Sequence, residues 1–129
     1  QAQGKHKEAE PLLRQVLDHN EKTRGPTDAV TLQSFYDFAM MQKAMGDPEK
    51  AESTLRRALL LCETKLGREH ADTLSSRTEL AVLLQAMGKQ EEAEQQLRRT
   101  LEGREETLGP KHADTLSSLD NLAMFLKAT

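Results

Sequence analysis

Aromatic side chains are scarce in this sequence of 129 residues, and tryptophan is absent. Aromatics make up 3% of the residues, as one tyrosine and three phenylalanines. A single compact globule usually fills its core with more aromatic bulk than this. The scarcity favours a layered helical stack held together by small aliphatic contacts. The abundant residues agree, because alanine, glutamate, lysine, leucine, arginine and glutamine are good helix formers.

Other absences narrow the class of protein. The single cysteine, Cys62, cannot form an internal disulfide, which favours a reducing, cytoplasmic location. No apolar run approaches the roughly 18 residues of a membrane span, and no signal-peptide pattern opens the sequence. The formal net charge is −3, without the basic stripe that nucleic-acid binding requires. We therefore expect neither a membrane nor a nucleic acid as partner.

What the sequence does contain is a repeat with a period of 42 residues. Gly4, Gly46 and Gly88 follow this interval, and aligning 46–87 with 88–129 without gaps gives about 22 identities. The length and the repeat together predict one domain over 1–129, made of units at about 4–45, 46–87 and 88–129. Other residues with the same spacing are Gly25, Gly67 and Gly109; Ala9, Ala51 and Ala93; Ala39, Ala81 and Ala123; Leu32, Leu74 and Leu116.

Each unit predicts two helices. In 71–87 the apolar residues, among them Leu74, Leu80 and Leu84, recur at helical spacing, and Gly88 ends the helix. Connections of a few residues force neighbouring helices to run antiparallel. The fold class is therefore all-α, a stack of antiparallel helix hairpins, or α-solenoid. The expected helices are about 5–23, 28–45, 48–65, 71–87, 90–107 and 113–128.

Small residues mark the closest helix contacts and carry a family resemblance. Ala81 and Ala93 lie 12 residues apart across the Gly88 turn, with a leucine before the first and another four residues after the second. This pattern resembles the tetratricopeptide repeat, whose usual length of about 34 residues is extended here. The segments 66–74 and 108–116 resemble the kinesin light chain subtype in particular.

The resemblance implies a right-handed superhelix in which the first helix of each pair lines a concave, peptide-binding groove. In the kinesin light chains this groove takes short acidic peptides that carry an aromatic residue. A groove position of that family, the asparagine before Leu-Ala, is Asn121 in the last unit but Glu79 and Asp37 in the others. Because two acidic residues make the groove more negative, we expect a basic or neutral peptide.

Helical spacing sketches the groove as the face opposite the buried leucines and alanines of 28–45, 71–87 and 113–128. It mixes polar groups with methionine, valine and tyrosine, which suits an amphipathic or extended peptide. The alternative is an ordinary solvated face. The candidate groove residues are Gln33, Tyr36, Asp37, Met40, Lys43, Ser75, Thr78, Glu79, Val82, Gln85, Ser117, Asp120, Asn121, Met124 and Lys127.

The sequence predicts no catalytic residue, no cofactor and no metal site. His70 and His112 share one repeat position just before a helix, as turn residues do, and no metal-binding motif is present. Cys62 has Asn20 and Arg104 at its equivalent positions, so we expect it to be partly exposed and inert. The repeated pairs Arg56-Arg57 and Arg98-Arg99 are expected to form ion pairs with glutamates of neighbouring helices.

The ends of the sequence suggest association. The chain begins at Gln1 on a second-type helix and ends on a first-type one, and a hairpin stack normally ends with a polar capping helix. Exposing the apolar residues of 113–128 would forfeit about 1.5–3 kcal/mol for each large side chain. We expect a fragment of a longer array, or a homodimer formed through uncapped ends. The residues concerned are Leu116, Leu119, Leu122, Phe125 and Leu126.

Two functions follow as hypotheses. The first is a non-catalytic protein-interaction module that binds a partner protein or peptide in the concave groove. The second is a structural segment of a longer repeat scaffold that self-associates through its open ends. A short linear ligand displaced by groove mutations would favour the first, and self-association alone would favour the second.

Overall fold

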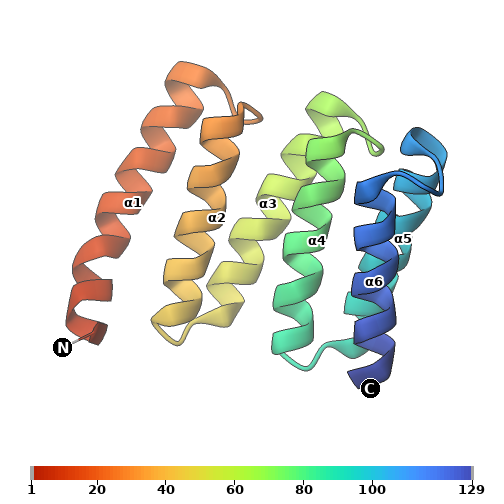
Figure 1. The fold of residues 1–129 in the computed structure, drawn as a ribbon. Coiled ribbons are helices and arrows are strands. Elements are labelled where there is room, and N and C mark those ends of the chain that lie inside the picture. Colours follow the sequence, from red (N-terminus) through yellow and green to blue (C-terminus); the bar gives the residue numbers. More distant parts are fainter. Residues whose placement is uncertain (1, 129) are drawn as a thin grey trace.

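The computed structural model describes residues 2–128, through which six helices run. Figure 1 shows α2, α4 and α6 side by side on one face of a single stack, with α3 and α5 behind them and α1 beside α2 at the left end. The substantial helix contacts join neighbours in chain order. The helices are α1 (Ala2–Arg24), α2 (Ala29–Ala44), α3 (Pro48–Leu66), α4 (Ala71–Ala86), α5 (Gln90–Leu108) and α6 (Ala113–Ala128).

The predicted fold class is confirmed, and each predicted helix boundary lies within three residues of the observed one. Local chemistry explains this accuracy. Asp47 caps α3 by accepting a hydrogen bond from the Lys50 N–H at 3.4 Å, and Pro48 occupies the first turn. Gly88 follows α4 with a φ of 80°, a conformation that favours glycine.

The two repeated histidines are turn residues, as predicted. The Nδ1 atom of His70 accepts a hydrogen bond from the Asp72 N–H at 3.1 Å. His112 does the same for the Asp114 N–H at 3.0 Å. Each histidine is the residue before its helix and satisfies one of the helix's unpaired N–H groups. Their repetition therefore reflects helix capping.

Two apolar clusters hold the stack together. In the larger one, Ala81 and Ala93 are fully buried, so small side chains do occupy the close contact between α4 and α5. The smaller cluster centres on Phe35, which is fully buried between helices α1, α2 and α3. The larger cluster comprises Ala39, Ala51, Leu55, Leu59, Leu80, Ala81, Leu83, Leu84, Ala93, Leu97, Leu122 and Phe125. The smaller comprises Leu17, Leu32, Phe35, Phe38, Ala58 and Cys62.

The predicted partial exposure of Cys62 is wrong, because its side chain is fully buried. Its thiol lies 3.6 Å from the Ser76 hydroxyl of the next helix. The equivalent residues bond to equivalent serines: the Asn20 amide donates to Ser34 at 2.8 Å, and Arg104 donates to the Ser118 hydroxyl at 2.6 Å. A polar side chain at this position therefore faces a serine of the next helix.

The predicted exposure of the α6 end is right for some residues and wrong for others. Leu122 and Phe125 are buried, because they point back into the larger cluster with Leu97 of α5. Leu116 and Leu119 are about half exposed. The remaining residue of the predicted end face, Leu126, is also substantially exposed.

Candidate functional site

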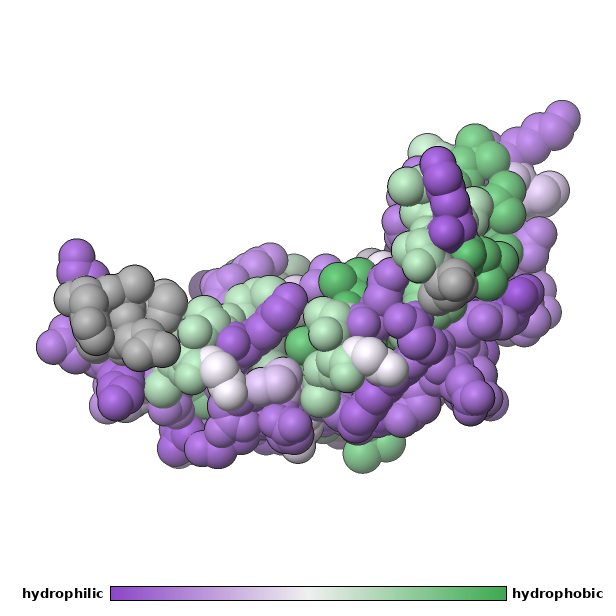
Figure 2. Space-filling model, turned by 90° about the horizontal axis from the view of Figure 1, so that it is seen from below, coloured by the Kyte–Doolittle hydropathy of each residue, from purple (hydrophilic) through white to green (hydrophobic). Residues whose placement is uncertain are grey.

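A row of exposed apolar side chains crosses the face formed by α2, α4 and α6. Met40, Val82 and Met124 occupy one position of the 42-residue repeat and are exposed by 42%, 54% and 57%. Figure 2, in which the α6 end rises above the rest, shows the stack curving toward this face. The curvature and the repeat thus align three apolar groups along one hollow surface, which we name the groove row.

Charged and polar groups flank the groove row. One helical turn before each row residue lie Asp37, Glu79 and Asn121, of which Glu79 is half-buried and the others exposed. One turn after the row, the exposed Lys43 and Lys127 supply positive charge. The groove is therefore apolar along its middle, acidic along one side and basic at two positions along the other.

The structure brings most of the predicted groove residues together on this face. The exposed ones are Gln33, Asp37, Met40, Lys43, Ser75, Val82, Ser117, Asp120, Asn121, Met124 and Lys127. Tyr36, Thr78, Glu79 and Gln85 are partly buried instead. Three of the predicted residues already bond within their own helices, since the Gln33 amide donates to the Asp37 carboxylate at 3.0 Å and the Thr78 hydroxyl donates to the Leu74 carbonyl at 3.0 Å.

Tyr36 ties α2 to α4 beneath the groove. Its hydroxyl lies 2.7 Å from the Ser76 hydroxyl, and its ring packs against both apolar clusters. Burial disfavours the phenolate and raises the pKa of Tyr36 from 10 to about 12, although the hydrogen bond with Ser76 acts in the opposite direction. Tyr36 is therefore chiefly a link between two helices that are not neighbours in the chain.

We expect Tyr36 in the folded protein to titrate near pH 12, and near its ordinary value of 10 in urea. Because its folded pKa is raised, the unfolded chain ionises first, and stability falls as the pH rises from about 10 to 12. Phenolate absorbance measures this directly, since Tyr36 is the only tyrosine and tryptophan is absent. Tyr36→Phe provides the blank. A midpoint near 10 in the folded protein would contradict the buried placement.

The arginine pairs behave only partly as predicted. Arg56 bonds to Glu92 of α5 at 2.6 Å, and Arg57 bonds to Glu21 of α1 at 2.7 Å, so both confirm pairing with neighbouring layers. Arg98 instead pairs within its own helix, with Glu94 at 2.9 Å. Because these pairs are largely exposed, each contributes only about 0–1 kcal/mol.

A cavity of about 570 Å³ behind α4 was not predicted from the sequence. Two signals could have indicated it. Gly103 lies inside a helix where Leu61 stands one repeat earlier, and Arg77 lies on the buried face of α4. We call this cavity the Arg77 pocket. Its lining residues are Leu66, Gly67, Arg68, Glu69, His70, Leu74, Arg77, Arg99, Glu102, Gly103 and Glu106.

Neither metal binding nor membrane crossing finds support among residues 2–128. No group of three or more histidine, cysteine, aspartate or glutamate side chains there could hold a metal ion. None of the helices described in that range combines the length and the apolar character of a membrane span.

Helix hairpins that repeat every 42 residues and stack in chain order define a helical repeat scaffold, a class built for protein interaction. A family model described as "Tetratricopeptide repeat" matches residues 1–63 and 43–106. The chain therefore belongs to the tetratricopeptide repeat family. A comparison with curated proteins finds no match.

Solved structures confirm the predicted resemblance to the kinesin light chain subtype. TPR-like repeats of a Podosopora anserina protein assigned to the kinesin light chains are 30% identical, with a TM-score of 0.75. A point-substituted form of these repeats is also 30% identical, with a TM-score of 0.74. BtubC (BKLC) from P. vanneervenii shares the fold at 22% identity and a TM-score of 0.77. These matches cover 97%, 95% and 99% of this chain, which spans 59%, 57% and 50% of theirs.

Proposed function

We propose that this chain is a non-catalytic interaction module that binds an extended partner segment along the groove row. The observation that carries the proposal is the exposure of Met40, Val82 and Met124 at one repeat position on the hollow face. Apolar side chains aligned in this way lose water contact when a partner covers them, which favours binding. Side chains spaced along an extended segment could each contact one member of the row.

Charge favours a basic or neutral segment. Asp37, Glu79 and Asp120 place negative charge along the groove, and complementary charge speeds association and selects partners. Lysines or arginines of the partner would face these carboxylates while its apolar residues cover the row. The groove thus favours a basic or neutral segment over the acidic peptides of the kinesin light chains, although Lys43 and Lys127 offset part of its negative charge.

The proposal includes the absence of catalysis. Burial raises the pKa of the Cys62 thiol, which makes it a poor nucleophile at neutral pH. Both exposed repeated histidines are engaged in capping their helices. The cytoplasmic location expected from the single cysteine stays a prediction.

A charge reversal in the groove tests the proposal. We expect Glu79→Lys to weaken binding of a fluorescent peptide with alternating leucine and lysine about fivefold, as the loss of roughly 1 kcal/mol implies. Fluorescence anisotropy at physiological salt measures the change. A matched peptide with glutamate in place of lysine should bind more weakly to the parent protein.

Glu91→Lys is the matched control, because Glu91 is an exposed glutamate in the first turn of α5 and its reversal changes the net charge equally. It should leave binding nearly unchanged if the groove, and not overall charge, selects the peptide. Equal effects of the two reversals, or no effect of Glu79→Lys, would rule out the groove as the binding surface.

Self-association is the second candidate function. On α6, Leu116 and Leu119 are about half exposed, whereas their counterparts on α4, Leu74 and Arg77, are buried. At the other end, Val16 of α1 is exposed where Ala58 of α3 is buried. Since α3 packs on α2 and α5 packs on α4, the α1 of a second copy could cover α6 in the same way.

Multi-angle light scattering over a range of concentrations tests this candidate. We expect the parent chain to increase in mass with concentration and Leu119→Glu to remain monomeric, because a buried unpaired charge opposes the contact. Leu60→Glu is the matched control, since Leu60 is exposed on α3 away from both ends. A parent chain that stays monomeric at every concentration would exclude end-to-end association.

A further inference from the structure

The Arg77 pocket lies on the opposite side of α4 from the groove. Arg77 and the groove residue Ser75 are about 200° apart around the helix. The α3–α4 turn, α4 and α5 line the pocket, which is open to solvent and has a volume of about 570 Å³. It is therefore a site separate from the groove row, on the back of the stack.

The equivalent layer one repeat earlier, formed by α1, α2 and α3, shows how side chains can fill the same space. There, Phe35 of α2 occupies the position of Arg77, and the Arg57 guanidinium lies 5.4 Å from its ring centroid. Arg57 also bonds to Glu21 at 2.7 Å, and Leu61 packs against the same cluster. An aromatic ring, an ion pair and a leucine thus close this layer.

In the layer of the Arg77 pocket each of these elements is changed. Arg77 replaces the phenylalanine, and Gly103 replaces the leucine. Glu63, the counterpart of Glu21, bonds to Arg77 at 3.1 Å, so it no longer reaches across to α5. Arg99, the counterpart of Arg57, consequently lines the pocket, and no ion pair to it is found within residues 2–128.

Arg77 is the deepest charged group of the pocket. Its side chain is only 3% exposed. Glu63 accepts from one terminal nitrogen, and Gln96 accepts from the other at 3.4 Å. The buried Nε–H has no hydrogen-bond partner in the part of the chain that the structure describes. A buried donor without an acceptor is costly, so an acceptor is favoured here, and because the atom is closed to water the Arg77 side chain must shift toward the cavity to meet one.

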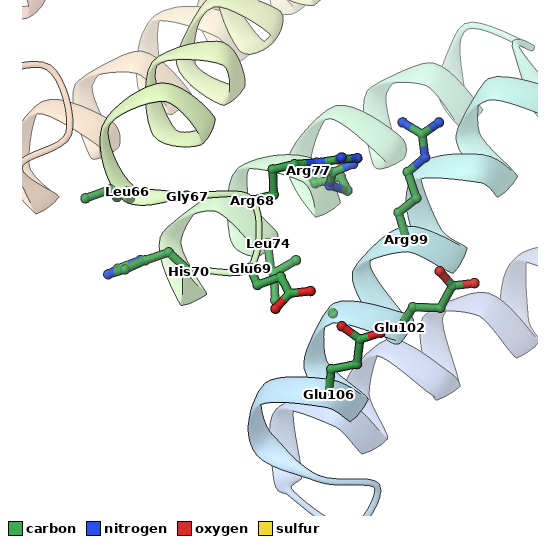
Figure 3. Close-up of a pocket in the computed structure, with 11 residues that line it drawn as sticks. Leu66, Gly67, Arg68, Glu69, His70, Leu74, Arg77, Arg99, Glu102 and Glu106 are labelled. Carbon is green, nitrogen blue, oxygen red and sulfur yellow. The ribbon is translucent and has the colours of Figure 1, made fainter.

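The pocket has a basic side and an acidic side. Figure 3 shows the Arg77 and Arg99 side chains along one side and the carboxylates of Glu69, Glu102 and Glu106 along the other. The neighbouring Glu69 raises the pKa of Glu106 through a hydrogen bond and charge repulsion. The three arginines and three glutamates of the lining balance in formal charge, so an anionic ligand is attracted on the basic side alone.

We propose that the Arg77 pocket receives the carboxylate of an acidic side chain from a partner protein, bound by Arg77 and Arg99. The carboxylate supplies the acceptor that the Arg77 Nε–H lacks, and guanidinium groups bind carboxylates in paired hydrogen bonds. The acidic side accommodates a basic residue next to it in the partner. The pocket is therefore a second contact point, on the opposite surface from the groove.

Side-chain NMR tests the proposal with glutamate capped at both ends as the probe. The Arg77 Nε–Hε signal, assigned by through-bond correlation to its backbone, should shift saturably at neutral pH. Capped glutamine should cause no comparable shift. Arg99→Gln should weaken the interaction at least threefold, and Gly103→Leu should abolish it by restoring the leucine of the preceding layer.

Arg57→Gln is the matched control. Arg57 holds the same repeat position as Arg99, but in its layer the ring of Phe35 fills the space of the pocket. It should leave the affinity unchanged. Gly103→Leu requires Leu74 to move, since a Cβ at 103 would lie 2.9 Å from its Cδ2 atom, so the Arg99 variant provides an independent measurement. The proposal is overturned by an unshifted signal, by an unchanged affinity of the Arg99 variant, or by inorganic phosphate binding more tightly than capped glutamate.

Discussion

Replacing Phe35 with alanine is expected to lower the free energy of unfolding by about 3–5 kcal/mol. The ring is fully buried and packs with Leu17 and Leu32 in the smaller cluster. Truncation removes this apolar contact and leaves a cavity between three helices. It also removes the ring on which the Arg57 guanidinium lies. That cation–π contact contributes about 0.5–1 kcal/mol more.

Leu119→Ala supplies the comparison, because Leu119 holds the same repeat position and is about half exposed. Urea denaturation of both variants, followed by circular dichroism, should show a loss of less than about 1.5 kcal/mol for Leu119→Ala, since about half of its side chain is already in water. Equal losses for the two variants would mean that the α6 end is covered in solution as fully as Phe35 is.

Replacing Glu63 with alanine is expected to cost about 3 kcal/mol, although Glu63 lies near the surface. Arg77 is buried, and burial lowers the pKa of its guanidinium while the Glu63 carboxylate acts in the opposite direction. Without Glu63 the Arg77 guanidinium is still removed from water, and it loses the carboxylate that compensates its charge. The expected value is the low end of the range for a broken buried ion pair, because Glu63 keeps part of its surface in water.

Removing the other partner should have the opposite effect. Arg77→Phe restores the arrangement of the preceding layer, with an aromatic ring beneath Arg99 as Phe35 lies beneath Arg57. Arg77→Phe removes the buried charge itself and leaves Glu63, which is 29% exposed and lies 3.9 Å from Arg68, so we expect stability to be unchanged or raised, by no more than the about 1–4 kcal/mol gained when a whole buried pair is replaced. Thermal and urea unfolding of both variants measure the contrast. A destabilised Arg77→Phe together with a neutral Glu63→Ala would show that the ion pair is not buried as described.

Short-range chemistry made most of the fold predictable. Helix limits depend on caps and turns, such as Asp47-Pro48 and Gly88, and these are local in sequence. The alanine contact between α4 and α5 follows from the repeat itself, because the same small residues recur at the same spacing. Helical geometry also placed Met40, Val82 and Met124 on an exposed face, and they are exposed, whereas their role in binding stays a prediction.

The wrong predictions concern side chains whose burial depends on which of several possible partners they contact. Cys62 has polar counterparts, which suggested exposure, yet all of them bond to a serine of the next helix. Leu122 and Phe125 are buried because they join the larger cluster, whose other members lie on the preceding helices. The Arg77 pocket depends on Glu63 bonding to Arg77, a choice between two arginines that no helical pattern determines.

Stacking in chain order also has a mechanical consequence. The substantial helix contacts join neighbours, while helices two apart are linked by side-chain bonds such as that of Tyr36 with Ser76. Such a chain has no single core that must break at once, so tension applied at its ends is absorbed hairpin by hairpin, as in a spring. A partner segment lying along Met40, Val82 and Met124 would join three helices that are not neighbours in the chain. It would thereby change the stiffness and the curvature of the helix stack.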